Sequence, residues 1–173
     1  MASVRTTEIK KVGRRSDNLS VIRAAAASFG YSSLKSEQER ALEAFIRGED
    51  VFVSLPTGYG KSLCYVLLPT IFDMLRRVDK ASIAIVISPL ISLMKDQTAI
   101  FNQKGLSSVC VSDKDDTSKK SRRGILKGKH QLVFMSPESL FCNLEWRRML
   151  STDIYMNNLI AFVVDEAHCV KKW

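Results

Sequence analysis

Short apolar runs alternate with longer amphipathic stretches from Val51 to the end of the chain. The runs are four to seven residues long and rich in β-branched residues, as is typical of buried strands. The stretches between them predict helices over residues 61–77, 90–104 and 138–150. Apolar strands that alternate with helices predict an α/β fold in which helices cover both faces of a parallel sheet. The five runs are VFVS (51–54), SIAIVIS (82–88), SSVCV (107–111), QLVFMS (131–136) and LIAFVVD (159–165).

Two further helices are predicted before the first run. One passes through VIRAAAASF and stops at Gly30, because a glycine often ends a helix. Ser36 with Glu39 forms a capping-box pattern at the start of the other, which ends near Gly48. Apolar residues at helical spacing give this second helix a buried stripe, made of Ala41, Leu42, Phe45 and Ile46.

A glycine-rich loop, GYGKS (58–62), follows the first apolar run. The backbone N–H groups of such a loop can surround phosphate oxygens, and the positive end of the helix that starts there points at the same anion. Lys61 would meet the outer phosphates, and the Ser62 hydroxyl would bind the Mg²⁺ that bridges them. The chain matches the second half of the GxxxxGKS/T pattern but has Leu55 at its first position. A plain strand-to-helix turn with an accidental lysine is the alternative.

Two carboxylates follow the last apolar run, in the sequence LIAFVVDEAH. Asp165 can hold Mg²⁺ through water, and Glu166 can orient and polarise an attacking water. Ligands of parallel sheets bind at the carboxyl ends of the strands. The loop and the carboxylates therefore predict two halves of one nucleotide site.

The charge balance favours a polyanionic partner. The chain has 26 Lys and Arg against 18 Asp and Glu, a net charge of +8. Such a balance suits nucleic acid, although many basic proteins bind no polyanion. Lys119, Lys120, Arg122 and Arg123 could line a nucleic-acid path, but we interpret them here as a solvated loop.

The cysteines, the apolar stretches and the N-terminal residues indicate where in the cell the protein works. The four cysteines form no CxxC pair, which predicts reduced thiols in an intracellular protein and neither a zinc site nor a disulfide framework. No apolar stretch suits the roughly 20 residues that cross a bilayer, so no membrane partner is expected. Residues 1–18 form a basic tail that we expect to be flexible, with a nuclear address as the alternative.

Four motifs together resemble the RecQ family of superfamily 2 DNA helicases. The resemblance implies that residues 19–173 are the first RecA-like lobe of a P-loop NTPase, truncated at its carboxyl end. It also implies ATP and Mg²⁺ as cofactors and DNA, single-stranded or as a tailed duplex, as partner. Leucine is common at the position of Leu55 in this family. The motifs are PTGYGKSLCY (56–65), SPLISLMKDQ (88–97), MSPESL (135–140) and DEAHCV (165–170).

The resemblance assigns roles at the nucleotide. FGYSSLKSEQ (29–38) is similar to an adenine-recognition motif, in which Gln38 reads the base edge and Lys35 stands where the family usually has arginine. Ser62 and Asp165 would hold Mg²⁺. The phosphate loop would comprise Thr57, Gly58, Tyr59, Gly60, Lys61 and Ser62. The catalytic set would comprise Lys61, Asp165, Glu166 and His168, with His168 coupling the ATP site to DNA.

The resemblance also implies contacts to DNA. Ser88 and Pro89 end a strand and open a helix, where backbone N–H groups can meet a phosphate. The other implied contacts are Gln97, Ser136, Glu138 and Trp173, of which Glu138 has helix capping as its alternative role. Trp173 stands in an aromatic-rich loop that senses single-stranded DNA. Four apolar residues of SPLISLMKDQ are interpreted as ordinary helix core: Leu90, Ile91, Leu93 and Met94.

The implied function is an ATP-dependent 3′–5′ DNA helicase that acts in the nucleus. The alternative is a truncated isoform or fragment that binds nucleotide or DNA weakly without unwinding. By the family fold, a further strand beyond residue 173 would lie between the strand before the phosphate loop and the strand before Asp165. We therefore expect both of those strands to have an unpaired edge.

Overall fold

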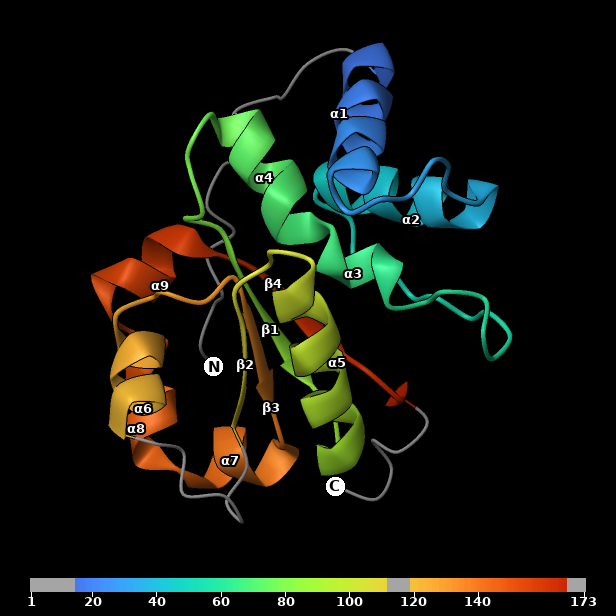
Figure 1. Cartoon of the computed structure of the whole chain (residues 1–173). Helices are drawn as coiled ribbons and strands as arrows, with labels where there is room; N and C mark the ends of the chain where they lie inside the picture. Colours follow the sequence, from blue (N-terminus) through green and yellow to red (C-terminus); the bar gives the residue numbers. More distant parts are fainter. Residues whose placement is uncertain (1–14, 112–118, 168–173) are drawn as a thin grey trace. The chain divides into compact units, whose positions relative to one another are not determined.

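A computed structural model describes residues 15–111 and 119–167 of the chain (Figure 1). The chain divides into two compact units, residues 1–64 and 65–173. Helices make up the regular structure described in the first unit, and the parallel sheet lies in the second. No helix in the described ranges has both the length and the apolar character that a membrane span requires.

The first unit is built on two helices, α1 (Arg15–Ser28) and α2 (Ser36–Ile46). After α1 the chain turns at Gly30, whose φ is +82° and whose N–H donates to the Ala27 carbonyl at 2.9 Å. The prediction that this helix stops at Gly30 is confirmed, because glycine adopts a positive φ at little cost. Within the predicted stripe of α2, Leu42 and Ile46 are buried.

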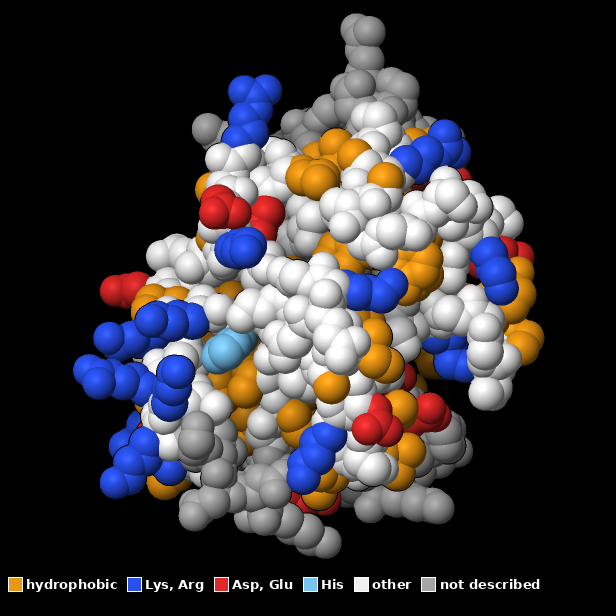
Figure 2. Space-filling model, in the orientation of Figure 1, with side chains coloured by type: hydrophobic (Ala, Val, Ile, Leu, Met, Phe, Trp, Pro, Cys, Tyr) orange, Lys and Arg blue, Asp and Glu red, His pale blue; other side chains and the backbone are white. Residues whose placement is uncertain are grey.

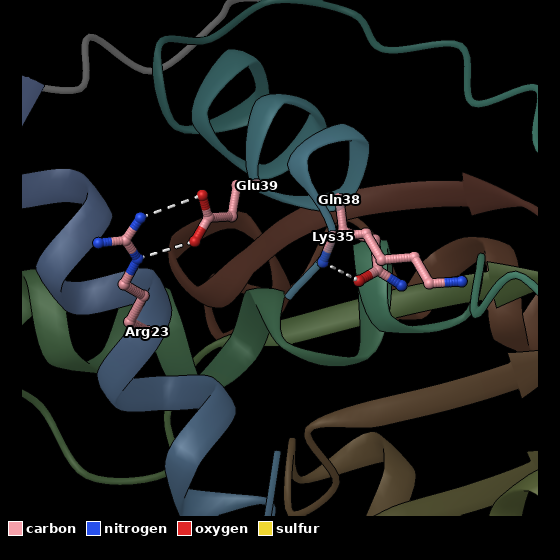
Figure 3. A network of polar contacts seen from close by, with 4 residues as sticks. All are labelled: Arg23, Lys35, Gln38 and Glu39. Atoms are coloured by element: carbon pink, nitrogen blue, oxygen red, sulfur yellow. Dashed lines mark hydrogen bonds and ion pairs between the residues drawn. The ribbon is translucent and has the colours of Figure 1, made fainter. Parts of the chain in front are cut away.

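The start of α2 differs by one residue from the predicted capping box. Lys35 is the N-cap, and its N–H donates to the Gln38 side-chain oxygen at 2.9 Å. Glu39 instead faces α1, where its carboxylate accepts from the Arg23 guanidinium at 2.8 Å (Figure 3). The box forms with glutamine at the third helical position, since either Gln or Glu can accept the N-cap proton there.

The run VFVS (51–54) does not form the predicted strand. Residues 51–54 have no regular structure, and the Phe52 side chain is 83% exposed. A strand exists only where its N–H and C=O groups meet a neighbouring strand. The described part of the first unit contains no strand for this run to pair with. An apolar run without a partner therefore stays irregular.

The helix predicted over residues 61–77 is divided into α3 (Leu63–Val66) and α4 (Leu68–Arg76). Pro69 stands in the first turn of α4. Proline has no N–H and its ring crowds the preceding turn, so it begins a helix more readily than it continues one. The boundary between the two units falls inside α3.

Four of the five predicted strands form in the second unit. All pairings are parallel, in the order β2-β3-β1-β4. The register places Ile85 of β1 opposite Val133 of β3 and Phe162 of β4. The α/β fold with a parallel sheet is thus confirmed. The strands are β1 (Ile83–Ile87), β2 (Ser108–Val111), β3 (Leu132–Met135) and β4 (Leu159–Val164).

Helices bury both faces of this sheet (Figure 1). On one face Phe134 stacks on Phe101 of α5 (Ile91–Gln103), with ring centroids 6.3 Å apart. The other face forms a cluster in which Ile85 and Val133 join residues of α6, α7, α8 and α9. Residues at odd and even positions of β1 are buried alike, which explains its uninterrupted apolar run.

None of the four helices on the second face was predicted with its observed bounds. The helix expected over 138–150 is two helices, because the Asn143 side chain accepts from the Glu145 N–H at 2.9 Å and starts a new one. Lys119, Lys120, Arg122 and Arg123, interpreted as a solvated loop, lie in a helix instead. The four helices of this face are α6 (Lys119–Leu126), α7 (Pro137–Cys142), α8 (Leu144–Met149) and α9 (Asp153–Asn158).

The strand β4 lies at one edge of the sheet. Its inner side pairs with β1, and no strand of the described residues pairs with its outer side. Phe162 and Val164 are 52% and 42% exposed. The strand that leads to Asp165 is therefore apolar in sequence but only partly covered.

Candidate functional site

The glycine-rich loop is shaped by two residues with positive φ. Gly58 has φ +78° and Gly60 has φ +85°, values that other residues adopt only with strain. The Lys61 ammonium lies back over the loop and donates to the Leu55 carbonyl at 2.9 Å and to the Pro56 carbonyl at 3.4 Å. The lysine is thus held at the loop by weak neutral acceptors that an anion can replace.

Several backbone donors of the loop have no acceptor in the part of the chain that the structure describes. Within the described residues, no hydrogen bond is made by the N–H groups of Gly58, Gly60, Lys61 and Ser62. These residues are exposed or half-buried, so water or a ligand can reach them. Consecutive free N–H groups beside a lysine ammonium form a concave arrangement that suits phosphate oxygens.

Gln38 anchors this loop to α2. Its side-chain nitrogen donates to the carbonyls of Tyr59 at 3.2 Å and Gly60 at 3.0 Å, and the side chain is almost fully buried. The Lys35 ammonium lies 3.4 Å from the centroid of the Tyr59 ring, a cation–π contact. The structure therefore brings Lys35 and Gln38, the proposed base-reading residues, into contact with the glycine-rich loop.

The helix after the loop is shorter than the sequence predicts. It was expected to begin at Lys61 and to present its positive end to an anion, but α3 has only four residues. The dipole of one turn is small, because each helix end draws its partial charge from several aligned peptide units. Binding of an anion here must therefore rely on the loop N–H groups and Lys61.

A groove of about 500 Å³ also opens in the first unit, between α2 and residues 49–55. It is lined by charged residues of α2 and by the irregular VFVS run, with Phe52 among them. The groove does not include residues 57–62. We therefore place the nucleotide candidate at the loop and not in this groove.

In the second unit, three predicted site residues lie next to one another where the strands end. The N–H of Ser136 donates to Val111 at 3.3 Å, that of Ser88 to Met135 at 3.0 Å, and that of Asp165 to Ile87 at 2.9 Å. Each is the first residue beyond its own strand and donates to the end of the neighbouring strand. We call Ser136, Ser88 and Asp165 the strand-end row.

In two members of this row, a polar group already forms a hydrogen bond within the protein. The Ser88 N–H, predicted to meet a phosphate, donates within the sheet, while the Ser88 hydroxyl is buried and has no hydrogen-bond partner among the described residues. The Ser136 hydroxyl caps α7 by accepting from the Ser139 N–H at 3.1 Å. Glu138 is exposed in the first turn of α7 and is not its cap.

The segment that follows Ser88 is only partly helix core. Met94 is fully buried, as predicted. Leu90 is 50% exposed, so its interpretation as core was wrong. Leu90 is the N-cap of α5 and lies outside the helix, where the sheet does not cover it. Pro89, Ile91 and Leu93 are half-buried.

Tyr65 is a residue that the sequence did not single out. Its hydroxyl lies 3.1 Å from the Gln97 side-chain oxygen and 3.4 Å from a carboxylate oxygen of Asp165. Tyr65 is 5% exposed, so both contacts are made in a buried setting. The hydroxyl joins a proposed DNA-contacting residue to a proposed Mg²⁺ ligand. A buried tyrosine at the end of the phosphate-loop motif was the available signal, since such a hydroxyl needs a partner.

The two carboxylates differ in backbone conformation. Glu166 has φ +54°, unusual for a residue with a side chain, and its N–H donates to the Asp165 carboxylate at 3.1 Å. Such strain is concentrated at functional sites. Oxygen ligands of this kind suit Mg²⁺, which keeps several waters, and the described residues contain no cluster of three or more metal-ligating side chains. His168 and Trp173 lie outside the described residues.

Cys64 follows the loop closely but does not offer a nucleophile. Burial raises the pKa of its thiol to about 11. A thiol with such a pKa is protonated at neutral pH, and the protonated form is unreactive. The chemistry that remains at the loop is anion binding.

Comparison with known proteins gives one matching family. Residues 35–173 match the DEAD/DEAH box helicase family. A protein of Acanthamoeba polyphaga mimivirus that carries an ATP-dependent RNA helicase name is 36% identical over 145 residues, 84% of this chain and 24% of its own. The ATP-dependent DNA helicase RecQ of Haemophilus influenzae is 30% identical over 167 residues, 95% of this chain and 24% of its own.

Two further matches agree with this family. The ATP-dependent helicase SGS1 of Saccharomyces cerevisiae is 36% identical over 148 residues, 84% of this chain and 10% of its own. The solved structure of the DUF1998 helicase MrfA superposes with a TM-score of 0.65 at 25% identity, covering 92% of this chain and 24% of that one. The chain thus spans about a quarter or less of the length of these proteins.

Proposed function

The chain belongs to the DEAD/DEAH box helicase family and has RecQ helicases among its relatives, and from this premise we propose that it supplies the ATP-binding residues of a RecQ-type 3′–5′ DNA helicase. The resemblance to RecQ that the four motifs predicted is confirmed. In the proposal, ATP hydrolysis by the complete protein drives the unwinding of DNA. Placement in the nucleus and work in DNA repair or recombination belong to the same proposal.

The observation that carries the proposal is the set of free N–H groups around Lys61. Gly58, Gly60, Lys61 and Ser62 leave these donors without an acceptor among the described residues, next to an ammonium held by two carbonyls. Phosphate oxygens would satisfy all of these donors at once. Gln38, fixed to the same loop, would lie within reach of the base of the same nucleotide.

Each remaining residue has a proposed role in hydrolysis. Ser62 and Asp165 would hold Mg²⁺, which neutralises charge on the phosphates when bound. Glu166 would orient the attacking water, and His168 would relay the state of the ATP site to DNA. Ser88, Pro89, Gln97, Ser136, Glu138 and Trp173 are the proposed DNA contacts, and Thr57 and Tyr59 complete the phosphate loop with Lys35 at the base.

Gln38 and Lys61 must both exchange carbonyl contacts when nucleotide binds. Both protons of the Gln38 amide are donated to Tyr59 and Gly60, so reading an adenine edge requires Gln38 to release at least one of them. Lys61 must likewise leave Leu55 and Pro56. Binding would therefore rearrange the loop, and the free energy of phosphate contacts has to exceed that of these neutral hydrogen bonds.

A two-part assay on the 173-residue chain tests the proposal. MgATP binding is measured by isothermal titration calorimetry, and ATP turnover is measured with and without single-stranded DNA. Lys61→Ala should weaken MgATP binding about tenfold to hundredfold, since a charge-assisted contact contributes about 1.5–3 kcal/mol. Glu166→Gln should leave binding intact and abolish turnover. Lys80→Ala, at an exposed lysine outside the loop, is the control for Lys61.

The assay also separates the proposal from its alternative. In helicases of this kind an arginine from a second lobe can raise the rate by about 10³ to 10⁵. MgATP binding without turnover by this chain would support a binding module that does not unwind. Wild-type affinity in Lys61→Ala would contradict the nucleotide proposal altogether.

A further inference from the structure

We propose that a basic surface on α6 and α8 binds the phosphate backbone of duplex DNA, at a place separate from the strand-end row. This proposal rests on the proposed function, because it assumes that the protein works on DNA. We define the α6–α8 basic face by its eight cations: Lys119, Lys120, Arg122, Arg123, Lys127, Lys129, Arg147 and Arg148.

The cations of α6 are placed on its solvent side by helical spacing. Lys120 and Arg123 of α6, and Lys127 directly after it, are exposed and follow one another at intervals of three and four residues. The Lys127 N–H donates to the Arg123 carbonyl at 3.2 Å as in a helix, so the three residues lie on one stripe. The opposite side carries Ile125, which is fully buried and whose carbonyl accepts from the Tyr155 hydroxyl at 2.9 Å. Because the helix advances about 5.4 Å per turn, this stripe offers one cation for each such step along a linear polyanion.

Contacts between α6 and α8 join the two helices into one surface. Arg122 pairs with the Glu145 carboxylate and lies 5.8 Å from the ring centroid of Trp146. Trp146 is buried, and the next two residues, Arg147 and Arg148, are exposed. Figure 2 shows the resulting group of Lys and Arg side chains around the pale-blue histidine, on the side where Figure 1 places α6 and α8.

Within the described residues, the charge of this face is almost entirely uncompensated. Residues 119–130 and 144–149 contain eight Lys and Arg and one acid, Glu145, which is used by Arg122. None of the other seven cations pairs with a carboxylate of the described residues. Seven cations without a carboxylate partner among the described residues create a positive potential on this face.

The surface has the character of a duplex site and not of a single-strand site. Single strands are bound by aromatic side chains on which bases stack. Residues 119–130 and 144–149, all described, contain Trp146 and His130 as aromatic side chains; Trp146 is buried and His130 is half-buried. A face that offers charge without stacking suits the regular phosphates of a duplex.

The part of the α6–α8 basic face around Lys127 and Lys129 lies away from the strand-end row. The turn after α6 leads to the amino ends of the strands, since a Cβ at Gly128 would lie 3.3 Å from the Ile83 side chain and Gln131 donates to Ser107 at 2.8 Å. Ser88, Ser136 and Asp165 stand at the carboxyl ends of the same strands. DNA on the basic face would therefore add a contact to those of the helicase motifs.

A matched pair of double variants tests the proposal in the 173-residue chain. Arg123→Gln with Lys127→Gln neutralises two cations of the stripe, and Arg77→Gln with Lys80→Gln neutralises one Arg and one Lys exposed in the segment after α4. Affinity for a fluorescein-labelled blunt duplex is measured over a series of salt concentrations. The first variant should bind about tenfold more weakly and lower the slope of log K against log salt by about 1.8, while the second should match the wild type.

The remaining outcomes overturn the proposal in different ways. Equal duplex binding by the two variants, or no duplex binding by the wild type, would remove the basic face as a DNA site. If the first variant lost as much affinity for polyglutamate or for phosphatidylserine vesicles as for the duplex, the face would be assigned to another polyanion. MgATP binding measured alongside reports on the proposed function separately, because both variants should keep it.

Discussion

The nucleotide loop of the first unit and the strand-end row of the second hold their polar groups in opposite ways. In the loop, Lys61 and Gln38 donate to neutral backbone carbonyls, and neighbouring N–H groups have no acceptor among the described residues. In the row, the backbone is fixed by sheet hydrogen bonds and the Ser136 hydroxyl caps α7, while the Ser88 hydroxyl is buried without a hydrogen-bond partner among the described residues. The loop backbone therefore gains hydrogen bonds from a ligand, whereas the backbone of the row is paired before any ligand arrives.

The sheet makes the strand-end row more rigid than the glycine-rich loop. The sheet positions Asp165 through Ile87, and it positions Ser88 through Met135. The loop has no strand beneath it, because residues 51–54 are irregular. We expect the glycine-rich loop to change its conformation when an anion binds and the strand-end row to keep its geometry. Four predictions test this difference, and the one with the largest expected effect comes first.

Removal of a buried carboxylate should reveal how much the second unit depends on fixed polar contacts. Asp73 of α4 is buried and accepts from the Ser82 N–H at 2.8 Å and from the Gln131 amide at 3.0 Å. Asp73→Ala leaves both donors buried and unpaired, so the free energy of unfolding should fall by about 3 kcal/mol. Urea denaturation followed by Trp fluorescence measures it, with exposed Asp79→Ala as the control. A loss below about 1 kcal/mol would contradict the rigid scaffold.

Glycine substitutions should show which part of the loop is under steric constraint. A Cβ at Gly60 would lie 2.7 Å from the Gln38 amide nitrogen, whereas a Cβ at Gly58 would meet nothing within 4 Å. Both substitutions place a side chain at positive φ, which costs about 1–2 kcal/mol. We expect Gly60→Ala to cost about 1 kcal/mol more than Gly58→Ala. Hydrogen exchange of α2 amides measures this difference, and it should shrink when Gln38 is changed to Ala.

Loss of the Tyr65 hydroxyl should disturb the strand-end row without unfolding it. Tyr65→Phe removes the contacts with Gln97 and Asp165, so stability should fall by about 1 kcal/mol. Tyr155→Phe, which removes a buried hydroxyl bound to the Ile125 carbonyl, should cost a similar amount. Only Tyr65→Phe should alter the ¹³C shift of the Asp165 carboxylate in NMR spectra. An unchanged shift would show that Tyr65 does not position Asp165.

The smallest expected effect is a dependence of stability on pH, which arises in the second unit. Burial, and then the nearby Lys129 charge, lower the pKa of His130. The folded state therefore binds fewer protons than the unfolded state near and below the ordinary pKa of about 6.5, so the free energy of unfolding should fall as the pH drops below that value. His130→Gln should reduce this dependence between about pH 7 and pH 5.5. The same slope in the variant would assign the effect to another group.

Much of the second unit could be predicted from the sequence, because its strands are buried on both faces. An uninterrupted run such as IAIVI indicates a buried parallel strand without knowledge of its neighbours. VFVS looks similar but formed no strand, since pairing depends on a partner elsewhere in the chain. Asn143, which divides one predicted helix into two, acts through a local cap that was overlooked.

The sequence predicted the candidate site only where the residues involved lie close together in the chain. The spacing of Gly58, Gly60, Lys61 and Ser62 indicates a phosphate loop by itself, because all four residues lie within one short segment. Tyr65 was missed because one of its partners, Asp165, lies 100 residues away in sequence. The use of the Ser88 N–H by the sheet could not be inferred either, because it depends on the register of β1 against β3.

The uncovered side of β4 has a consequence for hydrogen exchange along a single strand. In a parallel strand, successive N–H groups point to opposite sides, and the Asp165 N–H points toward β1 because it donates to the Ile87 carbonyl. By this alternation the Val163 N–H also points toward β1, while the N–H groups of Phe162 and Val164 point to the side that no described strand covers. Amide exchange along β4 should therefore alternate between slow and fast from one residue to the next, whereas β1, paired on both sides, should be slow throughout.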